Sequence, residues 1–405
     1  MKIRRLSAFT SAAVLAFVSL FTLASSGVAH AAGVTLYWCE FSSNSSFNTA
    51  SNWDTNSSCS GGTQEVPVSG DALVFDNTHL NSGLGLTNNI SGLDISSITF
   101  QGAGSGGYEL SGDSISLDSG INDTGTNAQS NTINLGATLT ASQTFNASGG
   151  SDFLSLGPSS TVTLGAYNLT LDEVASVYGL TGTGALTFSG SPTIVDTLNS
   201  ANSGFSGSVV IASSAQVYDE SGSLNGLGTG TVTINSGGSL YLEDSATTGT
   251  FLNNLNLAGS GSNTTGDYGA IISCLGYSST CESTGNTTLT LSGKVALSGN
   301  TQVVNGLYAS GSPAPTNTAT LDFTASCITT GGYTLSAVSS SSTTVVQPAV
   351  CVIASSKAAA APGSPDTGLG LASSRSSSVL LGSLLISSSL VALVIVARKF
   401  SKSKS

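Results

Sequence analysis

The sequence predicts an all-β body, built as a β-solenoid, and one transmembrane helix at the C-terminal end. Apolar residues recur in the pattern apolar-x-apolar through most of the chain, and alternation with period two is typical of short strands that bury one face. The doublets return at a spacing that suits one solenoid coil. The chain then ends in a long uncharged run followed by basic residues.

The segment 1–31 has the layout of a secretory signal peptide. Three basic residues precede an apolar run, and small residues follow it around Ala29 and Ala31. This order predicts cleavage after Ala31, so that the mature chain begins near Ala32 or Gly33. The alternative, a retained first transmembrane helix, does not explain the small residues directly after the apolar run.

The segment 379–397 predicts a transmembrane helix. It holds nineteen residues without a formal charge, close to the ~20 that cross a hydrocarbon layer. The segment 398–405 follows at once with one arginine and three lysines, which favour the cytoplasmic side. We therefore expect 398–405 to be a cytoplasmic tail and the preceding body to lie outside the cell. A buried core helix, the alternative for 379–397, leaves the basic tail unexplained.

The exported part is strongly acidic. Between Gly33 and Ser364, two lysines, Lys294 and Lys357, stand against twenty-one Asp and Glu residues, so the net charge of this part is −19. Such a surface repels nucleic acid phosphates and anionic lipid headgroups. Nucleic acid is therefore not expected as a partner, and the membrane is expected only through the C-terminal helix.

The six cysteines all lie in the exported part, and an even number of cysteines in an exported chain indicates disulfides. A zinc site is disfavoured, because the chain has no Cys-x-x-Cys pair and no histidine nearby. The sequence does not fix the pairing. Sequence order suggests Cys39 with Cys59, Cys274 with Cys281, and Cys327 with Cys351.

The apolar doublets predict the strands of the body. In each doublet, one position separates two apolar residues, and we expect both side chains to face the core. The doublets are Ile115 and Leu117, Ile133 and Leu135, Leu154 and Leu156, Val162 and Leu164, Leu169 and Leu171, Leu186 and Phe188, Val232 and Ile234, Leu240 and Leu242, Leu255 and Leu257, Leu289 and Leu291, Val295 and Leu297, and Leu321 and Phe323.

The spacing of the doublets predicts the coil. The doublets advance from Val162 to Leu186 and from Val232 to Leu255, which are steps of 24 and 23. We interpret each step as one coil, with glycine, serine and asparagine turns at its corners. Roughly 280 residues in coils of ~23 residues give about twelve coils.

A sandwich of two or three immunoglobulin-like domains also has short strands at regular spacing, and it is the alternative fold. The chain shows no linker and no break in composition from about Val34 to Cys351. Stacked coils need no such break, because each coil buries its apolar side against its neighbours. The solenoid is therefore favoured.

Residues 202–242 read NSGFSGSVVIASSAQVYDESGSLNGLGTGTVTINSGGSLYL. This stretch resembles the autotransporter-associated β-strand repeat, also called the passenger-associated transport repeat. The segment 51–76, with its Asn-Trp pair and its later Gly-Asp and Phe-Asp pairs, is similar to the opening that precedes such repeats. The resemblance implies a right-handed parallel β-helix over residues 70–351 and an N-terminal cap over residues 32–69. It does not extend to the secretion route of that family, which uses a β-barrel translocator.

A second resemblance concerns the four residues Pro365, Asp366, Thr367 and Gly368. With the apolar and basic segments that follow, they resemble the sorting signal of sortase substrates, in which Leu-Pro-x-Thr-Gly precedes an apolar span and a basic tail. Ser364 stands at the leucine position. The resemblance implies cleavage between Thr367 and Gly368 and transfer of the chain to an amine of the cell envelope. The alternative is a retained membrane anchor, whose hydrophobic length suffices by itself.

No catalytic residue is predicted. A Ser-His-Asp hydrolase needs a histidine, and His79, expected in an exposed loop, is the one that remains after the signal. The adjacent acids are interpreted as solubilising residues, because neighbours in a strand point to opposite faces. Asp219 and Glu243 are separated by the length of about one coil, which would place them on one face. The adjacent acidic pairs are Asp172-Glu173, Asp219-Glu220 and Glu243-Asp244.

No cofactor and no metal site is predicted either. The chain has no Asp-x-Asp-x-Asp-Gly loop and no Gly-Gly-x-Gly-x-Asp nonapeptide repeat for calcium. It also has no glycine loop ending in Gly-Lys-Ser/Thr for phosphate. The glycines are interpreted as turn residues.

Together these observations predict an exported surface protein, anchored to the cell envelope, that is adhesin-like or structural and presents a binding surface. Residues 352–378, rich in Ala, Ser and Pro, are expected to be its tether. The expected partners are a sortase-like transpeptidase, the envelope, and a glycan or protein on a host or neighbouring cell. We do not expect an enzyme. The alternative is a glycan-acting lyase or glycosidase that uses paired carboxylates.

Overall fold

The computed structural model describes residues 33–40, 44–79, 84–103, 106–125, 130–147, 153–190, 195–261, 269–275, 286–305, 319–324, 327–338 and 343–346. The chain divides into two compact units, Met1–Val352 and Ile353–Ser405, and every described residue belongs to the first. The elements in this described part are strands and two 3₁₀ helices. The prediction of an all-β body is therefore confirmed.

Several predicted segments lie outside the described residues. These are the signal peptide 1–31, the tether 352–378 with its sorting motif, the transmembrane segment 379–397 and the basic tail 398–405. Within the part of the chain that is described, no helix is long and apolar enough to cross a membrane.

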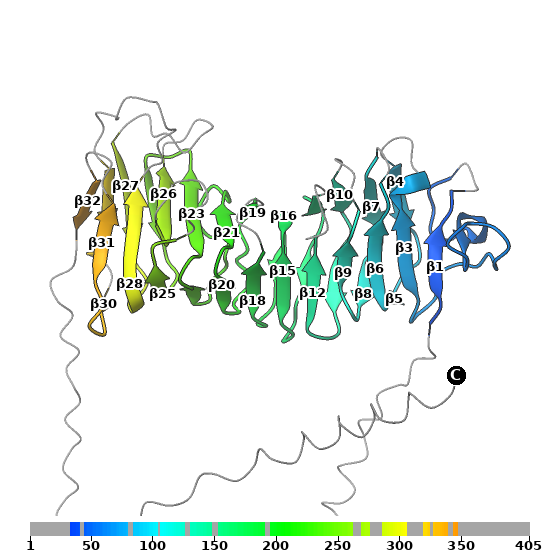
Figure 1. The fold of residues 1–405 in the computed structure, drawn as a ribbon, viewed down its shortest axis with the longest axis horizontal. Coiled ribbons are helices and arrows are strands. Elements are labelled where there is room, and N and C mark those ends of the chain that lie inside the picture. The colour runs from blue at the N-terminus through cyan, green and yellow to red at the C-terminus, as the bar shows by residue number, and fades with distance from the viewer. Residues whose placement is uncertain are drawn as a thin grey trace, which may run out of the picture. The chain divides into compact units, whose positions relative to one another are not determined.

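Nearly all strand pairs in the described residues are parallel, and Figure 1 shows the strands side by side in a row. One series of pairs, which we call the first column, holds twelve described strands. They are β1 (Thr35–Trp38), β3 (Ala72–Asp76), β6 (Ser97–Gln101), β9 (Ile121–Asp123), β12 (Gln143–Asn146), β15 (Leu169–Asp172), β18 (Leu186–Ser189), β20 (Val209–Ile211), β22 (Val232–Ile234), β25 (Leu255–Gly259), β28 (Val295–Asn305) and β30 (Ile328–Thr329).

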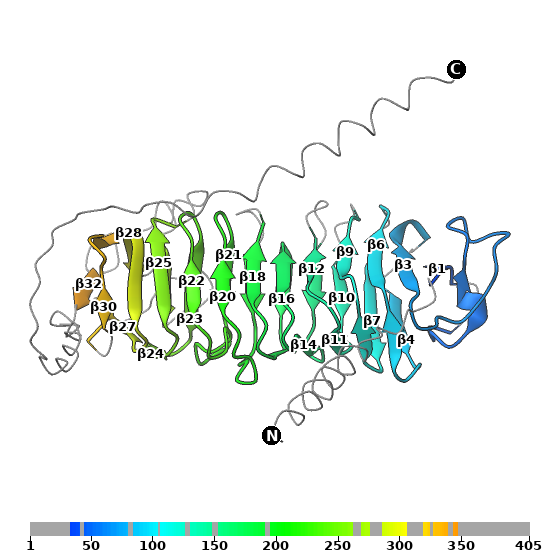
Figure 2. The ribbon, with the colours of Figure 1, turned by 90° about the horizontal axis from the view of Figure 1, so that it is seen from below.

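A second column runs beside the first, and the long strand β28 belongs to both. Figure 2, turned by 90°, shows the same row from below. The other strands of the second column are β4 (Leu84–Asn88), β7 (Tyr108–Gly112), β10 (Asn131–Ile133), β13 (Leu154–Leu156), β16 (Val174–Val177), β19 (Val195–Leu198), β21 (Gln216–Asp219), β23 (Ser239–Asp244), β26 (Ile271–Leu275) and β31 (Leu335–Val338).

Two shorter columns complete the parallel pairing. The third comprises β5 (Leu93–Ile95), β8 (Ile115–Leu117), β11 (Ala137–Leu139), β14 (Val162–Thr163) and β17 (Leu180–Thr181). The fourth comprises β24 (Thr248–Phe251), β27 (Thr287–Leu291), β29 (Ala319–Asp322) and β32 (Thr343–Val346). The 3₁₀ helices are η1 (Ala50–Asn52) and η2 (Asn77–His79).

The columns are visited in a repeating order along the chain. From β3 to β17 the order is first, second, third column, and it then starts again. This pairing excludes the antiparallel immunoglobulin-like sandwich that the sequence left open, because strands of such a sandwich pair with antiparallel neighbours.

One of the two predicted coil lengths is wrong. Thr163 lies beside Thr181, 18 residues further along the chain, and Asp172 lies beside Ser189, 17 residues further. The chain therefore returns to the same column sooner than predicted. The step predicted as one coil joins β14 and β18, which belong to two different columns but have doublets that look alike in sequence. The second predicted step is confirmed, because β22 pairs with β25.

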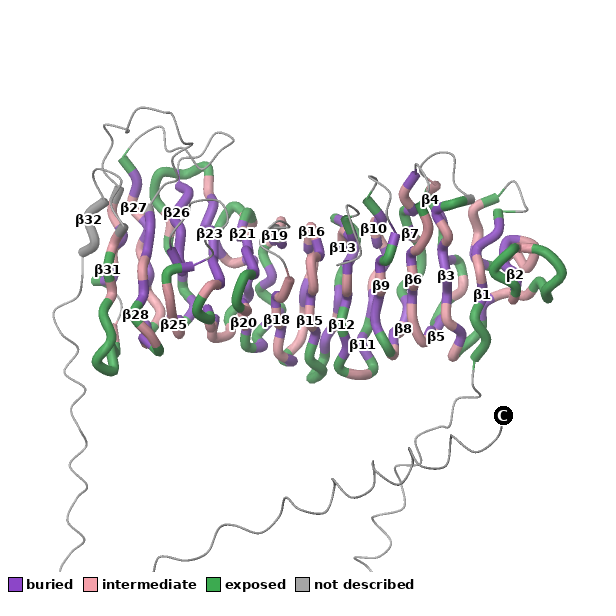
Figure 3. The backbone as a smooth tube through the Cα atoms, in the orientation of Figure 1, coloured by how far each residue is buried: buried purple, intermediate pink, exposed green. Residues whose placement is uncertain are grey.

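The inward faces of the columns form one continuous apolar core. Strands such as β8, β13 and β22 bury their first and third residues and leave the middle one half-buried, and Figure 3 shows this alternation along the row. The buried cluster extends from Leu36 to Phe323. All twenty-four residues of the doublets predicted from the sequence belong to this core, so the expectation that both side chains of each doublet face the core is confirmed.

Glycines allow neighbouring segments to approach closely at the start of some first-column strands. A Cβ atom at Gly184, Gly207 or Gly230 would overlap a backbone carbonyl of the preceding segment. The three glycines are equally spaced along the chain. Close approach of backbones therefore explains the glycines of this repeat better than a phosphate site does.

The N-terminal end of the row is closed by a short antiparallel pair. Strand β1 pairs with β2 (Trp53–Asp54), which places Trp38 opposite Trp53. Their rings meet edge to face with centroids 5.0 Å apart. Strand β1 lies inside the segment 32–69 predicted as a cap, and it already pairs in parallel with β3.

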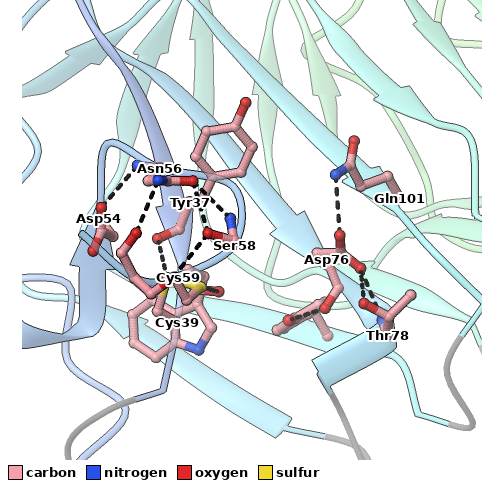
Figure 4. The surroundings of a disulfide bond; sticks show 12 residues. Tyr37, Cys39, Asp54, Asn56, Ser58, Cys59, Asp76, Thr78 and Gln101 are labelled. Carbon is pink, nitrogen blue, oxygen red and sulfur yellow. Dashed lines mark hydrogen bonds between the residues drawn. A yellow bond between two sulfur atoms is a disulfide. The ribbon is translucent and has the colours of Figure 1, made fainter. Parts of the chain in front are cut away.

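A disulfide fixes the loop beside this closing pair. Cys39 and Cys59 are bonded, with Cα atoms 5.5 Å apart, and Figure 4 shows the loop around them. The pairing predicted for these two cysteines is confirmed. Cys274 and Cys327 are also disulfide-bonded, while Cys281 and Cys351, the partners predicted for them, lie outside the described residues.

Candidate binding surface

One row of side chains runs along the outward face of the second column. The strand register places each member opposite the next. Glu109 begins the row, hydroxyl side chains follow it, and aromatic and then aliphatic side chains form the last part. The members are Glu109, Thr132, Ser155, Ser176, Thr197, Tyr218, Tyr241, Ile272 and Val304.

The change of chemistry at Tyr218 marks this part of the face. Threonine is a common residue on the solvent side of a strand, where its branched side chain suits the pleated surface. The apolar side chains that follow Tyr218 in the row are buried although they lie on the outward face, and departures of this kind from the usual pattern tend to gather at functional sites. We therefore take the region that begins at Tyr218 as the candidate site.

The apolar side chains of this region form a cluster separate from the core. It consists of Tyr241, Ile272, Cys274 and Val304, with Tyr218 packed against it, and we call these five residues the aromatic patch. The rings of Tyr218 and Tyr241 are stacked, with centroids 4.0 Å apart and planes 8° apart. Tyr241 and Ile272 are fully buried, whereas Tyr218 is half-buried. Tyr218 is therefore the ring of the pair that reaches the surface.

Two glutamates continue the outward face next to the rings. Glu220 and Glu243 each stand two residues after a tyrosine of the patch, and so on the same side of the strand. We call them the carboxyl pair. Glu220 is exposed, and Glu243 is 4% exposed. Glu243 lies opposite Cys274 on the next strand.

The carboxyl pair holds a proton near neutral pH. Burial, together with the charge of Glu220 and a hydrogen bond with its side chain, raises the pKa of Glu243 to about 7. The protonated carboxyl donates to the carboxylate of Glu220, because two charged carboxylates in contact repel each other. The second oxygen of Glu243, Oε2, is buried and has no hydrogen-bond partner among the described residues.

Asp219 and Glu243 do not share a face, contrary to the expectation from their separation along the chain. Asp219 lies opposite Leu242 and is buried on the core side. Its carboxylate accepts hydrogen bonds from the backbone N–H groups of Ser221, at 3.1 Å, and Gly226, at 3.0 Å. It therefore holds the turn after β21, and its role is structural.

Another acidic group surrounds Asp196 on β19. Asp196 is 1% exposed, and burial, followed by the charges of Asp172 and Glu173, raises its pKa well above the ordinary range. Asp172 accepts a hydrogen bond of 3.2 Å from the hydroxyl of Ser189. Within the described part of the chain, no group of three or more His, Cys, Asp or Glu side chains has the arrangement of a metal site.

The remaining predicted site residues lie apart from this surface or outside the description. His79 ends the short helix η2 rather than standing in a loop. Asp244 accepts a hydrogen bond of 2.9 Å from the backbone N–H of Ala246, which fixes the turn after β23. The cleavage residues Ala29 and Ala31 and the sorting residues Pro365, Asp366, Thr367 and Gly368 lie outside the described residues.

Sequence reasoning missed the aromatic patch, although a signal for it exists. The triplet Tyr-x-Glu occurs at Tyr218 to Glu220 and again at Tyr241 to Glu243. The two copies are separated by the same step that brings Asn256 beside Thr233, a step of 23 residues. A search for equal triplets at that spacing would have paired the two glutamates and the two tyrosines.

Comparison of the chain with protein-family models, with curated proteins and with solved structures finds no match in any of the three.

The surface suits recognition of an uncharged or hydroxyl-rich ligand. The exposed carboxylate of Glu220 accepts hydrogen bonds from hydroxyl groups, and the edge of the Tyr218 ring offers apolar contact. Lys294 is the one cationic side chain among the described residues. A phosphate or sulfate group would therefore meet only repulsion at the carboxyl pair.

Proposed function

We propose that the chain is an exported, envelope-anchored surface protein whose body is a right-handed parallel β-solenoid with an adhesin-like or structural role. The repeating order of the columns supports the solenoid. The twelve described strands of the first column also agree with the about twelve coils expected from the sequence. The resemblance of residues 202–242 to the autotransporter-associated repeat supports the handedness.

The observation that carries the binding role is the change along the outward row at Tyr218. Between Glu109 and Tyr218 the members of the row carry hydroxyl side chains. From Tyr218 on, a stacked ring pair and the carboxyl pair stand together at one place on the outward face. We propose that this surface binds a neutral glycan or a protein segment rich in hydroxyl groups on a neighbouring or host cell.

The proposal of surface anchoring rests on the two chain segments that precede and follow the body. The signal-like segment 1–31 supports export. The motif Pro365 to Gly368, with the apolar and basic segments after it, supports attachment by a sortase-like transpeptidase. The single membrane span 379–397 is the alternative form of attachment.

A glycan-cleaving function has less support. Retaining and inverting glycosidases hold their two carboxyl groups about 5 to 9 Å apart, so that a sugar or a water fits between them. The carboxyls of Glu220 and Glu243 are hydrogen-bonded to each other, which leaves no room for either. The inward acids Asp196 and Asp219 are buried among core residues.

The binding role is tested with the purified mature protein on an array of neutral and acidic glycans and on intact cells. We expect Tyr218→Ala and Glu220→Gln each to weaken binding at least tenfold, because both side chains reach the surface of the patch. Glu109→Gln, on the same row at its hydroxyl end, is the matched control and is expected to bind normally. Equal binding by all three variants would refute the assignment of this surface.

A further inference from the structure

An asparagine in the loop after β2 has the sequence and the setting of a glycan acceptor. Asn56, Ser57 and Ser58 form the triplet Asn-x-Ser, the acceptor pattern for N-glycosylation in exported proteins. All three residues are exposed. The adjacent Cys59 forms the disulfide with Cys39, so the loop is held in place while its tip faces solvent.

The turn brings the hydroxyl of the triplet onto the amide of the asparagine. The Ser58 hydroxyl donates to Oδ1 of Asn56 at 2.9 Å, and the Ser58 backbone N–H donates to the same oxygen at 3.0 Å. Figure 4 shows both bonds. Donation to the carbonyl oxygen draws electron density from the amide, which makes its N–H groups more acidic. The hydroxyl at the third position therefore favours loss of the Nδ2 proton, which the nitrogen must lose to bond to the sugar.

The side-chain amide of Asn56 contributes little to the contacts that hold the surrounding structure together. Its Nδ2 donates to the carbonyl of Ser60 at 2.8 Å, and its own backbone N–H is held by Asp54 at 2.8 Å. These contacts all belong to the same short loop. Substitution of one Nδ2 hydrogen by a sugar thus leaves the backbone contact to Asp54 and the disulfide unchanged.

In other Asn-x-Ser/Thr triplets of the described residues, the asparagine side chain makes hydrogen bonds to distant parts of the fold. Oδ1 of Asn89 accepts from Ser46 and Asn48 across 43 and 41 residues. Asn122 and Asn146 each open a triplet, and Nδ2 of Asn146 donates to Oδ1 of Asn122 on the neighbouring strand. Oδ1 of Asn168 accepts from the backbone of Ala185. In these cases the amide joins segments that are distant in sequence.

Two more triplets lie next to other elements of the fold. Asn44 accepts from the side chain of Asn52, a residue that is fully buried. Asn286 stands directly before β27, whose Thr288 is paired with Thr248 of β24. Exposure, a local turn and a preset contact from the third-position hydroxyl are found together at Asn56.

We propose that Asn56 is an N-glycosylation site, modified after export by an oligosaccharyltransferase that uses a lipid-linked sugar phosphate as donor. A bond forms between Nδ2 of Asn56 and the anomeric carbon of the sugar. The bond from that carbon to the phosphate oxygen breaks, and the lipid phosphate leaves with the electron pair. One amide proton passes to a base of the transferase. This inference rests on the export proposed above.

Mass spectrometry of the mature protein from its native cells tests the site. The N-terminal peptide reports export, because it begins near Ala32 only after cleavage of the signal. We expect the peptide that contains Asn56 to carry a glycan, and enzymatic release of the glycan to convert Asn56 to aspartate. An exported protein with unmodified Asn56 would overturn the glycosylation while leaving export intact. A chain that still begins at Met1 would overturn both.

Substitutions in the triplet test which of its side chains the glycosylation requires. Asn56→Gln and Ser58→Ala are expected to abolish the glycan, and Ser58→Thr is expected to retain it because the hydroxyl is kept. Ser57→Ala changes the middle position of the triplet alone and serves as the matched control. Persistence of the glycan in Ser58→Ala would contradict the role assigned to the Ser58 hydroxyl.

Discussion

The rings of Tyr218 and Tyr241 lie face to face on the outward side of neighbouring strands, with centroids 4.0 Å apart and planes 8° apart. The two tyrosines are directly opposite in the parallel register of β21 and β23. Cross-strand aromatic pairs stabilise the strands that carry them. The outward face of the second column therefore contributes to stability here as well as to the proposed recognition.

The ring of Tyr241 is expected to matter more for stability than the ring of Tyr218. Tyr241 is fully buried, and truncation of a buried aromatic side chain costs about 3 kcal/mol or more. Tyr218→Ala should cost less because its ring is half-buried. Thermal unfolding followed by circular dichroism measures the order. Thr132→Ala, on the hydroxyl part of the same row, is the control, and equal losses for the two tyrosines would contradict the packing described.

The stability of the protein is expected to fall as the pH rises through 7. The pKa of Glu243 is raised to about 7 in the folded chain, so the folded state binds a proton that the unfolded state has already lost. This contribution is complete below about pH 4 and disappears as the pH passes the folded pKa. A shift of this size corresponds to at most about 3 kcal/mol.

Glu243→Gln imitates the protonated carboxyl at every pH. We expect this variant to be more stable than the native protein at about pH 8 and to lose the part of the pH dependence that Glu243 causes. Denaturant unfolding at a series of pH values provides the measurement. An unchanged pH profile in Glu243→Gln would contradict the assignment of the shared proton.

A second prediction concerns the effect of the buried carboxyl of Asp196 on stability. Burial and the nearby charges of Asp172 and Glu173 raise its pKa, and one of its oxygens has no hydrogen-bond partner among the described residues. Replacement by the neutral amide in Asp196→Asn removes the cost of a buried charge. The melting temperature at neutral and alkaline pH should therefore rise. Asp113→Asn on the exposed surface is the comparison, and a lower melting temperature for Asp196→Asn would refute this account.

The disulfide between Cys39 and Cys59 closes a loop with a sequence separation of 20. A loop of this length gives about 3 kcal/mol through restriction of the unfolded chain. The double variant with serine at both positions should lose about that amount and expose the edge of β1 by fraying of β2. Hydrogen exchange of the backbone amides of β1 measures this fraying directly. Full protection of β1 in the variant would show that the aromatic packing of Trp38 and Trp53 suffices without the bond.

The fold class was predictable because the buried residues of each strand form a short, local pattern in the sequence. Doublets such as Val232 and Ile234 alternate with polar residues, and period two leaves little choice but a strand with one buried face. The disulfide of Cys39 was predictable for a similar reason, since Cys59 is the cysteine nearest to it along the chain. Both predictions depend on short stretches of chain.

The register of distant strands was harder to predict. Val162 and Leu186 both belong to good doublets, yet they lie in different columns, because the repeat near them is shorter than the repeat near Val232. Sequence patterns give the face of a residue but not which strand lies beside it. The same limit misplaced Glu243 relative to Asp219, by a single residue in register, and hid the pairing of the two stacked tyrosines.

Export and attachment to the envelope are the central claim of the proposed function, and the C-terminal peptide of the protein from native envelopes tests it most directly. The protein is released with wall-degrading enzymes, and the peptide is identified by mass spectrometry. We predict a chain that ends at Thr367 and carries an added envelope group. An intact chain through Ser405, recovered only with detergent, would contradict sortase attachment and leave the segment 379–397 as the anchor.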